Sequence, residues 1–233
     1  MAFRKKWPSI LKYNPDILVV QECELKDKIL ASENFPKHED FIWFGENKNK
    51  GIGIISFNGI RIKRSPYHNE DFKFILPVDI LNFGSLKLFV IWAMPSKEGN
   101  KASYIGQVWK SLNHYDLSEG NAILIGDWNS NAIWDKERRV GNHTQSIDLL
   151  SKFRIFSLYH TLRNEAPGNE TEPTLFLLKK QDKPYHLDYC FASESLICNA
   201  TEIKIGKYSD WIKQSDHMPL IIDNLNTERI RIG

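Results

Sequence analysis

Short runs of apolar residues recur along the chain, and they constrain its fold more than any other feature. Most of them are rich in Ile, Leu, Val and Phe, and turn-forming residues separate many of them, as in Asn14-Pro15-Asp16. Runs of this length and composition are typical of β-strands buried in a core. The strand candidates are residues 17–20, 41–44, 52–57, 75–81, 86–92, 122–125, 174–178, 186–192 and 218–222.

Helical periodicity is confined to a few segments. Residues 3–13, 102–115 and 145–153 carry apolar side chains at helical spacing or read as probable helices. Because strands outnumber helices and the two alternate, the pattern favours an α/β (α+β) protein with sheets packed face to face and helices outside. No segment resembles an interdomain linker, so residues 1–233 are expected to form a single domain.

Composition narrows the class of protein. Among 233 residues, 42% are hydrophobic and 26% are charged, which is ordinary for a soluble globular chain. A net charge of +2 does not fit a protein that holds nucleic acid by charge alone. No apolar run approaches the roughly 18 residues of a membrane span, and the N-terminus lacks the apolar stretch of a signal peptide. The three cysteines form no CxxC pair, and their odd number and apolar neighbours suggest reduced thiols, so a cytoplasmic location is expected.

Two of the apolar strands end in a carboxylate. Glu22 follows 17–20, and Asp127 follows 122–125. A carboxylate at the end of a buried strand is held rigidly and partly desolvated, which suits a hard cation such as Mg²⁺. The alternative is that these residues are polar only because the strands leave the core there.

Asp127 begins the tetrad Asp127-Trp128-Asn129-Ser130. Residues two apart on an extended chain point to the same side, so Asp127 and Asn129 would project together. An acceptor beside an amide donor could orient a water molecule and hold a phosphoryl oxygen. The alternative is a turn, because Asp, Asn and Ser favour turns for local hydrogen-bonding reasons.

A third acid, Asp188, lies within an apolar strand pattern and needs a partner if it is buried. The best candidate is His217, which follows Asp216 and directly precedes an apolar run. A carboxylate bonded to one ring nitrogen fixes the tautomer and leaves the other nitrogen for a reaction. The alternative for Asp188 is a solvent-facing residue on a half-exposed strand.

Taken in order, these segments resemble the endonuclease/exonuclease/phosphatase superfamily, in particular its deoxyribonuclease I and exonuclease III-like members. The matching pieces run from residue 21 to residue 219, nearly the whole chain. They are Gln21-Glu22, Gly51-Ile52-Gly53-Ile54-Ile55-Ser56, Gly126-Asp127-Trp128-Asn129, Leu187-Asp188-Tyr189 and Ser215-Asp216-His217-Met218-Pro219.

The resemblance implies a four-layer sandwich of two central sheets flanked by helices, and hydrolysis of a phosphate ester by in-line attack of water. It implies that Glu22 binds Mg²⁺ or Mn²⁺ and that Asp216 belongs to the network of the metal and the histidine. The resemblance also implies four catalytic residues. Asp127 would orient the attacking water, Asn129 would contact the phosphate, and Asp188 would hold the fourth residue, His217.

The chain departs from the family pattern in two places. A first strand carrying an asparagine is missing ahead of residue 3, so we expect that Met1 is a misassigned start or a boundary and that about one strand's length lies upstream. Without that strand, a neighbouring strand would expose an unpaired edge. In addition, residues 91–95 lack the tyrosine or histidine that many members place there.

Nucleic acid is the expected substrate, with no membrane and no obligate protein partner evident. A phosphomonoesterase or a lipid phosphodiesterase on the same scaffold, and a degenerate binder without catalysis, remain the alternatives. Aromatic residues near Lys and Arg could shape a polynucleotide track, and a solvated surface is the plain alternative. The candidates for such a track are Lys48, Lys50, Arg61, Lys63, Arg64, Trp134, Lys136, Arg138, Arg139, Lys179, Lys180 and Tyr185. Trp128 and Trp134, which flank Asn129 and Asn131, are the residues of most interest.

Overall fold

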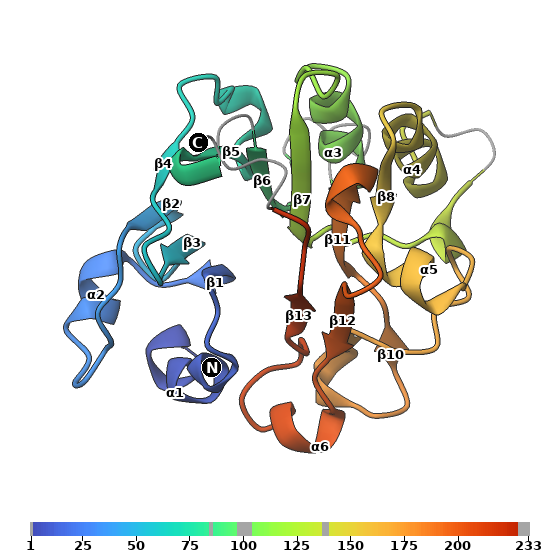
Figure 1. The fold of residues 1–233 in the computed structure, drawn as a ribbon. Helices are drawn as coiled ribbons and strands as arrows, with labels where there is room; N and C mark the ends of the chain where they lie inside the picture. The colour runs from blue at the N-terminus through green and yellow to red at the C-terminus, as the bar shows by residue number, and fades with distance from the viewer. Residues whose placement is uncertain (1, 84–85, 97–103, 137–139, 228–233) are drawn as a thin grey trace.

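A six-stranded sheet is the largest element of the fold (Figure 1). The computed structural model describes residues 2–83, 86–96, 104–136 and 140–227. The strand order is β4-β5-β6-β7-β11-β8, antiparallel except for the central pair β6 and β7. The strands are β4 (Ile62–Arg64), β5 (Ile75–Ile80), β6 (Leu86–Trp92), β7 (Asn121–Asp127), β8 (Ile155–Ser157) and β11 (Asp188–Ser193).

Smaller sheets complete the β structure. An antiparallel three-stranded sheet has the order β1-β3-β2, and β9 with β10 and β12 with β13 form two-stranded ribbons. The strands are β1 (Ile17–Cys23), β2 (Phe41–Asn47), β3 (Lys50–Ser56), β9 (Leu175–Phe176), β10 (Pro184–Tyr185), β12 (Glu202–Ile205) and β13 (Leu220–Asp223).

Helices cover the outer faces of the sheets (Figure 1). On the three-stranded sheet lie 3₁₀ turns and short helices, and on the six-stranded sheet lie longer helices. On the first lie η1 (Phe3–Lys5), α1 (Trp7–Ile10), η2 (Leu11–Tyr13) and α2 (Lys26–Leu30), and on the second lie α3 (Ile105–Leu112) and α4 (His143–Lys152). The helix α5 (Leu158–Arg163) packs instead into the cluster between the sheets, and α6 (Tyr208–Trp211) packs against Phe176 and Met218. No helix in the described residues is long and apolar enough to cross a membrane.

Three apolar clusters separate four layers. The middle cluster joins Ile54 of β3 to Val90 of β6, so it lies between the two main sheets. A second cluster packs Val108 of α3 against Leu124 of β7, and a third packs Phe3 against the three-stranded sheet. Each fully buried aliphatic side chain contributes about 1.5–3 kcal/mol. The fold class predicted from the sequence, a sandwich of two central sheets with helices outside, is confirmed.

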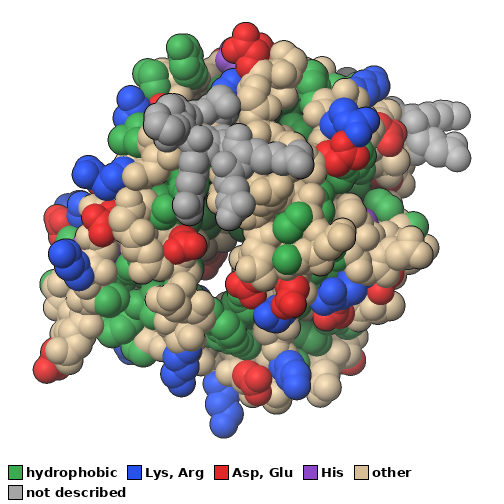
Figure 2. Space-filling view, in the orientation of Figure 1, with side chains coloured by type: hydrophobic (Ala, Val, Ile, Leu, Met, Phe, Trp, Pro, Cys, Tyr) green, Lys and Arg blue, Asp and Glu red, His purple; other side chains and the backbone are tan. Residues whose placement is uncertain are grey.

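A cleft of 1210 Å³ opens between the sheets. Within the described residues, β1 and β13 are both edge strands, and both line this cleft. Ile17, Ile123 and Ile222, from β1, β7 and β13, are only half-buried there. Figure 2 shows an opening near the centre of this face of the molecule. The sandwich is therefore incompletely filled, and its cleft reaches from an apolar floor to the polar ends of β1 and β7.

Several predicted elements differ in detail. The predicted strand 174–178 shortens to Leu175–Phe176, because the chain turns at Leu178 with φ 57°. The helical pattern of 3–13 breaks into short α and 3₁₀ pieces, with a proline at the start of α1. Residues 102 and 103 of the predicted helix 102–115 lie outside the described residues, as do Arg138 and Arg139. Trp128, expected to be of interest for a polynucleotide track, is instead fully buried in the apolar cluster between the six-stranded sheet and its helices, so that expectation is wrong. The short strands β4, β8, β10 and β12 were not predicted, because two to four residues carry too little periodicity.

Candidate active site

Three of the predicted site residues meet at the polar end of the cleft. Asp127 at the end of β7 lies directly opposite Asp188 at the start of β11 in the antiparallel ladder. An isolated bridge between Leu175 and His217 brings the histidine to the same place. One ligand atom from each of Asp127, Asp188 and His217 lies within 4.8 Å of the others. Because two acids directly opposite each other repel, this arrangement favours a bound cation.

Gly126 permits β7 to deliver Asp127 to this position. Its φ is 142°, and a Cβ atom there would lie 2.0 Å from the carbonyl oxygen of Ile91 and 2.6 Å from Nε2 of Gln21. The Gln21 side chain donates from that nitrogen to the same Ile91 carbonyl at 3.2 Å. A side chain at residue 126 would therefore separate β7 from β6 and from the end of β1.

Asn129 holds the carboxylate of Asp127. With φ 46° its backbone turns back, and its N–H donates to Oδ1 of Asp127 at 2.9 Å. Its Nδ2 donates to Oδ2 of Asp127 at 2.8 Å and to the Ala93 carbonyl at 3.0 Å. Both amide hydrogens are taken, so contact with a phosphate requires one of these bonds to be exchanged.

Asp188 and His217 are paired as predicted from the sequence. Nδ1 of His217 lies 2.9 Å from Oδ2 of Asp188, and the two side chains are 35% and 14% exposed. No described protein group bonds Nε2 of His217, which leaves that nitrogen for a ligand in the cleft. The carboxylate thereby selects the tautomer with hydrogen on Nδ1 and orients the ring.

The electrostatics of the cluster follow from burial and from the paired charges. Burial first, and the neighbouring charge of Asp188 second, raise the pKa of Asp127 to about 7. Burial by itself would lower the pKa of His217, but the adjacent Asp188 carboxylate outweighs it and raises the pKa to about 10. The site therefore stabilises positive charge close to its acids.

Glu22 and Asp216 lie in the same cleft but outside the three-residue group. A bulge in β1 puts Glu22 at φ 55°, and bulges of this kind re-aim side chains near active sites. Its side chain is 59% exposed and forms an ion pair of 2.8 Å with Nζ of Lys50. A ligand role for Glu22 therefore requires that the ion pair with Lys50 be broken or shared.

Three further residues of this region escaped the sequence analysis. Thr174 is fully buried, and its Oγ1 accepts hydrogen bonds from the N–H groups of Leu187 and Asp188, each at 2.9 Å. Lys6 and Tyr104 line the cleft, and burial lowers the pKa of Lys6. The spacing of these residues in the chain carries no signal of a site, since only the tertiary fold brings them there.

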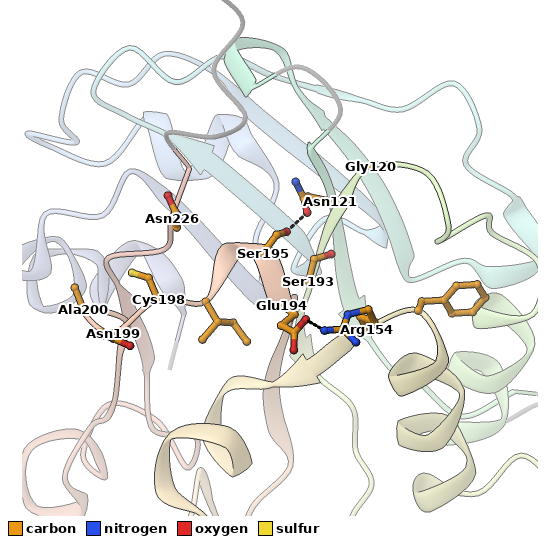
Figure 3. Close-up of a pocket in the computed structure, with 12 residues that line it drawn as sticks. Gly120, Asn121, Arg154, Ser193, Glu194, Ser195, Cys198, Asn199, Ala200 and Asn226 are labelled. Carbon is orange, nitrogen blue, oxygen red and sulfur yellow. Dashed lines mark hydrogen bonds and ion pairs between the residues drawn. The ribbon is translucent and has the colours of Figure 1, made fainter.

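A second, shallower hollow of 890 Å³ lies at the opposite end of the six-stranded sheet. Asn121 at the start of β7 and Ser193 at the end of β11 border it, with Arg154 and Cys198 nearby (Figure 3). Arg154 forms an ion pair with Glu194 there. None of the predicted site residues lines this hollow.

Solved structures share the fold over nearly the full chain at low sequence identity. The endonuclease domain of TRAS1, a telomere-specific non-LTR retrotransposon, is 15% identical with a TM-score of 0.61, over 95% of this chain and 90% of that one. A 3'-5' exonuclease (NExo) from Neisseria meningitidis is 15% identical with a TM-score of 0.62, over 96% of both chains.

An AP endonuclease from Archaeoglobus fulgidus is 16% identical with a TM-score of 0.62, over 92% of this chain and 91% of that one. No curated protein sequence matches the chain. The sequence profile of the Endonuclease/Exonuclease/phosphatase family matches residues 8–217, and the chain therefore belongs to this family of phosphoesterases.

Proposed function

We propose that this phosphoesterase hydrolyses phosphodiester bonds of nucleic acid and requires a divalent cation, Mg²⁺ or Mn²⁺. The observation that carries the proposal is the convergence of Asp127, Asp188 and His217 within 4.8 Å at the end of the cleft. Carboxylate oxygens are the ligands that hard divalent cations prefer. Glu22 and Asp216 line the same cleft as the two aspartates of this group. The donor set of the site therefore fits such an ion.

Four residues have catalytic roles in this proposal. Asp127 orients the attacking water and accepts its proton, and Asn129 holds that carboxylate and reaches the scissile phosphate by exchanging one of its hydrogen bonds. Asp188 fixes the ring of His217 through the 2.9 Å bond to Nδ1. His217 then presents Nε2 to the phosphate, where the positive charge of the ring offsets the negative charge on the oxygens of the five-coordinate transition state.

Glu22 and Asp216 hold the cation in the proposal, beside the acids of the three-residue group. Both line the cleft, and the ion pair with Lys50 keeps Glu22 at its mouth. A bound divalent cation supplies Lewis-acid stabilisation of the negative charge that develops on the phosphate oxygens. As a ligand of the cation, Glu22 would have to give up or share its ion pair with Lys50.

The nuclease assignment draws support from proteins of the same fold. The similar structures include an endonuclease domain, a 3'-5' exonuclease and an AP endonuclease. A further Neisseria structure, with a TM-score of 0.63 and 15% identity, is described as a 3' phosphatase bound to product DNA hairpin. A phosphomonoester is therefore the second candidate for the substrate. Three cysteines without disulfides support a reducing compartment such as the cytoplasm.

A hydrolysis screen tests the proposal. Plasmid DNA, single-stranded DNA, RNA, bis-p-nitrophenyl phosphate and a p-nitrophenyl monoester are each incubated with Mg²⁺, with Mn²⁺ and with EDTA. We expect diester cleavage that EDTA abolishes and that Asp127→Asn reduces by orders of magnitude. The matched control Asp148→Asn, on the exposed face of α4, should retain full activity. Cleavage of the monoester alone would favour the phosphatase, and no hydrolysis of any ester would favour a binder.

A further inference from the structure

Exposed apolar side chains gather on two loops beside the candidate active site. Ile133 and Trp134 are 53% and 47% exposed, and Leu177 and Leu178 are 41% and 68% exposed. The indole of Trp134 lies against the phenol of Tyr185, with ring centroids 5.2 Å apart and planes tilted by 45°. This pair, the aromatic platform, keeps nearly half of Trp134 open to solvent. An exposed aromatic surface of this kind costs free energy in water unless a ligand covers it.

The aromatic platform stands on a rigid frame. Trp134 belongs to the 3₁₀ turn η6 (Ala132–Trp134), which Asn131 caps by accepting the N–H of Ile133 at 3.0 Å. The buried amide of Asn131 also donates to the carbonyl of His186 at 3.0 Å, next to Tyr185. The same asparagine therefore holds both halves of the platform, so little conformational entropy is lost when a ligand stacks on it.

The platform is joined to the candidate active site by two short stretches of chain. Tyr185 precedes Asp188 by three residues, so their backbones are at most roughly 10 Å apart at about 3.3 Å per residue. The carbonyl of Tyr185 accepts the N–H of Thr174 at 2.9 Å, and the hydroxyl of Thr174 accepts the N–H of Asp188. Trp134 follows Asn129 in the loop that leaves β7. The platform therefore lies close enough to the site for a nucleotide next to the scissile phosphate to reach it.

Positive charge borders the platform on the side of the hairpin between β9 and β10. Residues 177–183 contain three lysines and one aspartate. Lys179 and Lys180 are exposed, and neither forms an ion pair with a described carboxylate. The acid next to Trp134, Asp135, is occupied instead at the start of α4, where it accepts the N–H of His143 at 2.9 Å. Nζ of Lys179 donates to the carbonyl of Lys213 at 3.4 Å, which leaves its charge unpaired by an acid. Lysines without an acidic partner, beside stacking aromatics, match the phosphates and bases of a nucleic acid strand.

We propose that Trp134 and Tyr185 form a stacking site for an unpaired nucleobase, which makes single-stranded nucleic acid the preferred substrate class. The inference rests on the proposed phosphodiesterase function and adds strandedness to it. An unpaired base offers a free face to an aromatic ring, whereas a base inside a duplex is stacked on its neighbours. The platform thus selects strands that are single-stranded next to the scissile phosphate.

Binding is measured first, without hydrolysis. The full chain in EDTA is titrated with a fluorescently labelled single-stranded oligonucleotide and with the matching duplex, and anisotropy reports the Kd. Trp134→Ala should weaken single-strand binding about 5- to 150-fold, the loss expected when one base–aromatic stack worth about 1–3 kcal/mol is removed. Trp134→Phe should restore most of that loss. The matched control Tyr67→Ala removes an aromatic ring that is 80% exposed on another loop and should change nothing.

Intrinsic fluorescence gives a second, independent binding signal. Single-stranded oligonucleotide should quench the indole of Trp134 in the parent, and that quenching should disappear in Trp134→Phe even though anisotropy still reports binding. Equal losses of single-strand and duplex binding in Trp134→Ala, or parental binding in that variant, would overturn the inference. Unchanged Trp134 fluorescence at saturating oligonucleotide would also overturn the inference of a stacking site. The aromatic platform would then be assigned to the docking of a protein.

Kinetics separate this inference from the proposed function. Trp134→Ala should raise KM for the single strand and leave kcat/KM for bis-p-nitrophenyl phosphate unchanged, because that ester carries no base. If the variant lost activity on both substrates equally, the ring would act through the structure of the site and the stacking site would be refuted. If the parent hydrolysed neither substrate but still bound the single strand through Trp134, the proposed function would fail and the stacking site would stand.

Discussion

Replacing Thr174 by valine tests how the acids of the site are held. Its hydroxyl accepts the N–H groups of Leu187 and Asp188, each at 2.9 Å, and the residue is fully buried. Valine has nearly the same shape but accepts no hydrogen bond, so both donors lose their partner. A buried donor without a partner costs about 1–3 kcal/mol. The Leu187 N–H is buried and the Asp188 N–H only partly so. The total is therefore about 2–4 kcal/mol.

Equilibrium unfolding in urea measures this loss. With an m-value of about 3 kcal/mol per M, a loss of about 3 kcal/mol moves the midpoint down by about 1 M without changing m. Thr174→Ser keeps the acceptor and should lose only about 1 kcal/mol through its missing methyl group. If Thr174→Val and Thr174→Ser were equally stable, or if valine left the midpoint unchanged, the two hydrogen bonds would not stabilise the fold as argued.

Three further predictions concern the residues of the cleft and the buried residue His143. Glu22→Gln should keep the fold and weaken metal-dependent hydrolysis by orders of magnitude. Activity of the variant equal to that of the parent, at limiting and at saturating Mg²⁺ alike, would contradict the ligand role. Asp188→Asn combined with His217→Ala should be hardly slower than His217→Ala alone, whereas multiplying losses would show that the two residues act independently. Burial lowers the pKa of His143 to about 4, so its unfolded form takes up a proton first as the pH falls. His143 should therefore lower the free energy of unfolding by about 3 kcal/mol between pH 6.5 and pH 4, while the raised pKa of Asp127 acts in the opposite direction over the same range. The His143 share is measured as the difference between the parent and His143→Gln in the change of unfolding free energy between the two pH values.

Local chemistry in the sequence was sufficient for the main strands and for the residue types of the site. Apolar runs such as 122–125 can bury their side chains only inside a sheet, and a carboxylate directly after such a run must emerge at its end. Because successive residues of a strand point to opposite faces, the strand pattern around Asp188 likewise separates Tyr189 from Cys190, and they pack in different apolar clusters. These properties depend on side-chain period and on backbone direction, which neighbouring residues already define.

Only the tertiary structure decided which of these residues meet and what holds them. Asp127 and Asp188 become direct neighbours through the register of β7 and β11, a pairing over a long stretch of chain that no local pattern specifies. Thr174 and the Trp134–Tyr185 pair acquire their roles from hydrogen bonds and ring contacts between distant loops. Such contacts depend on how whole sheets and loops pack against each other. The sequence therefore determined the chemistry available to this protein, while the packing of its layers determined where that chemistry is assembled.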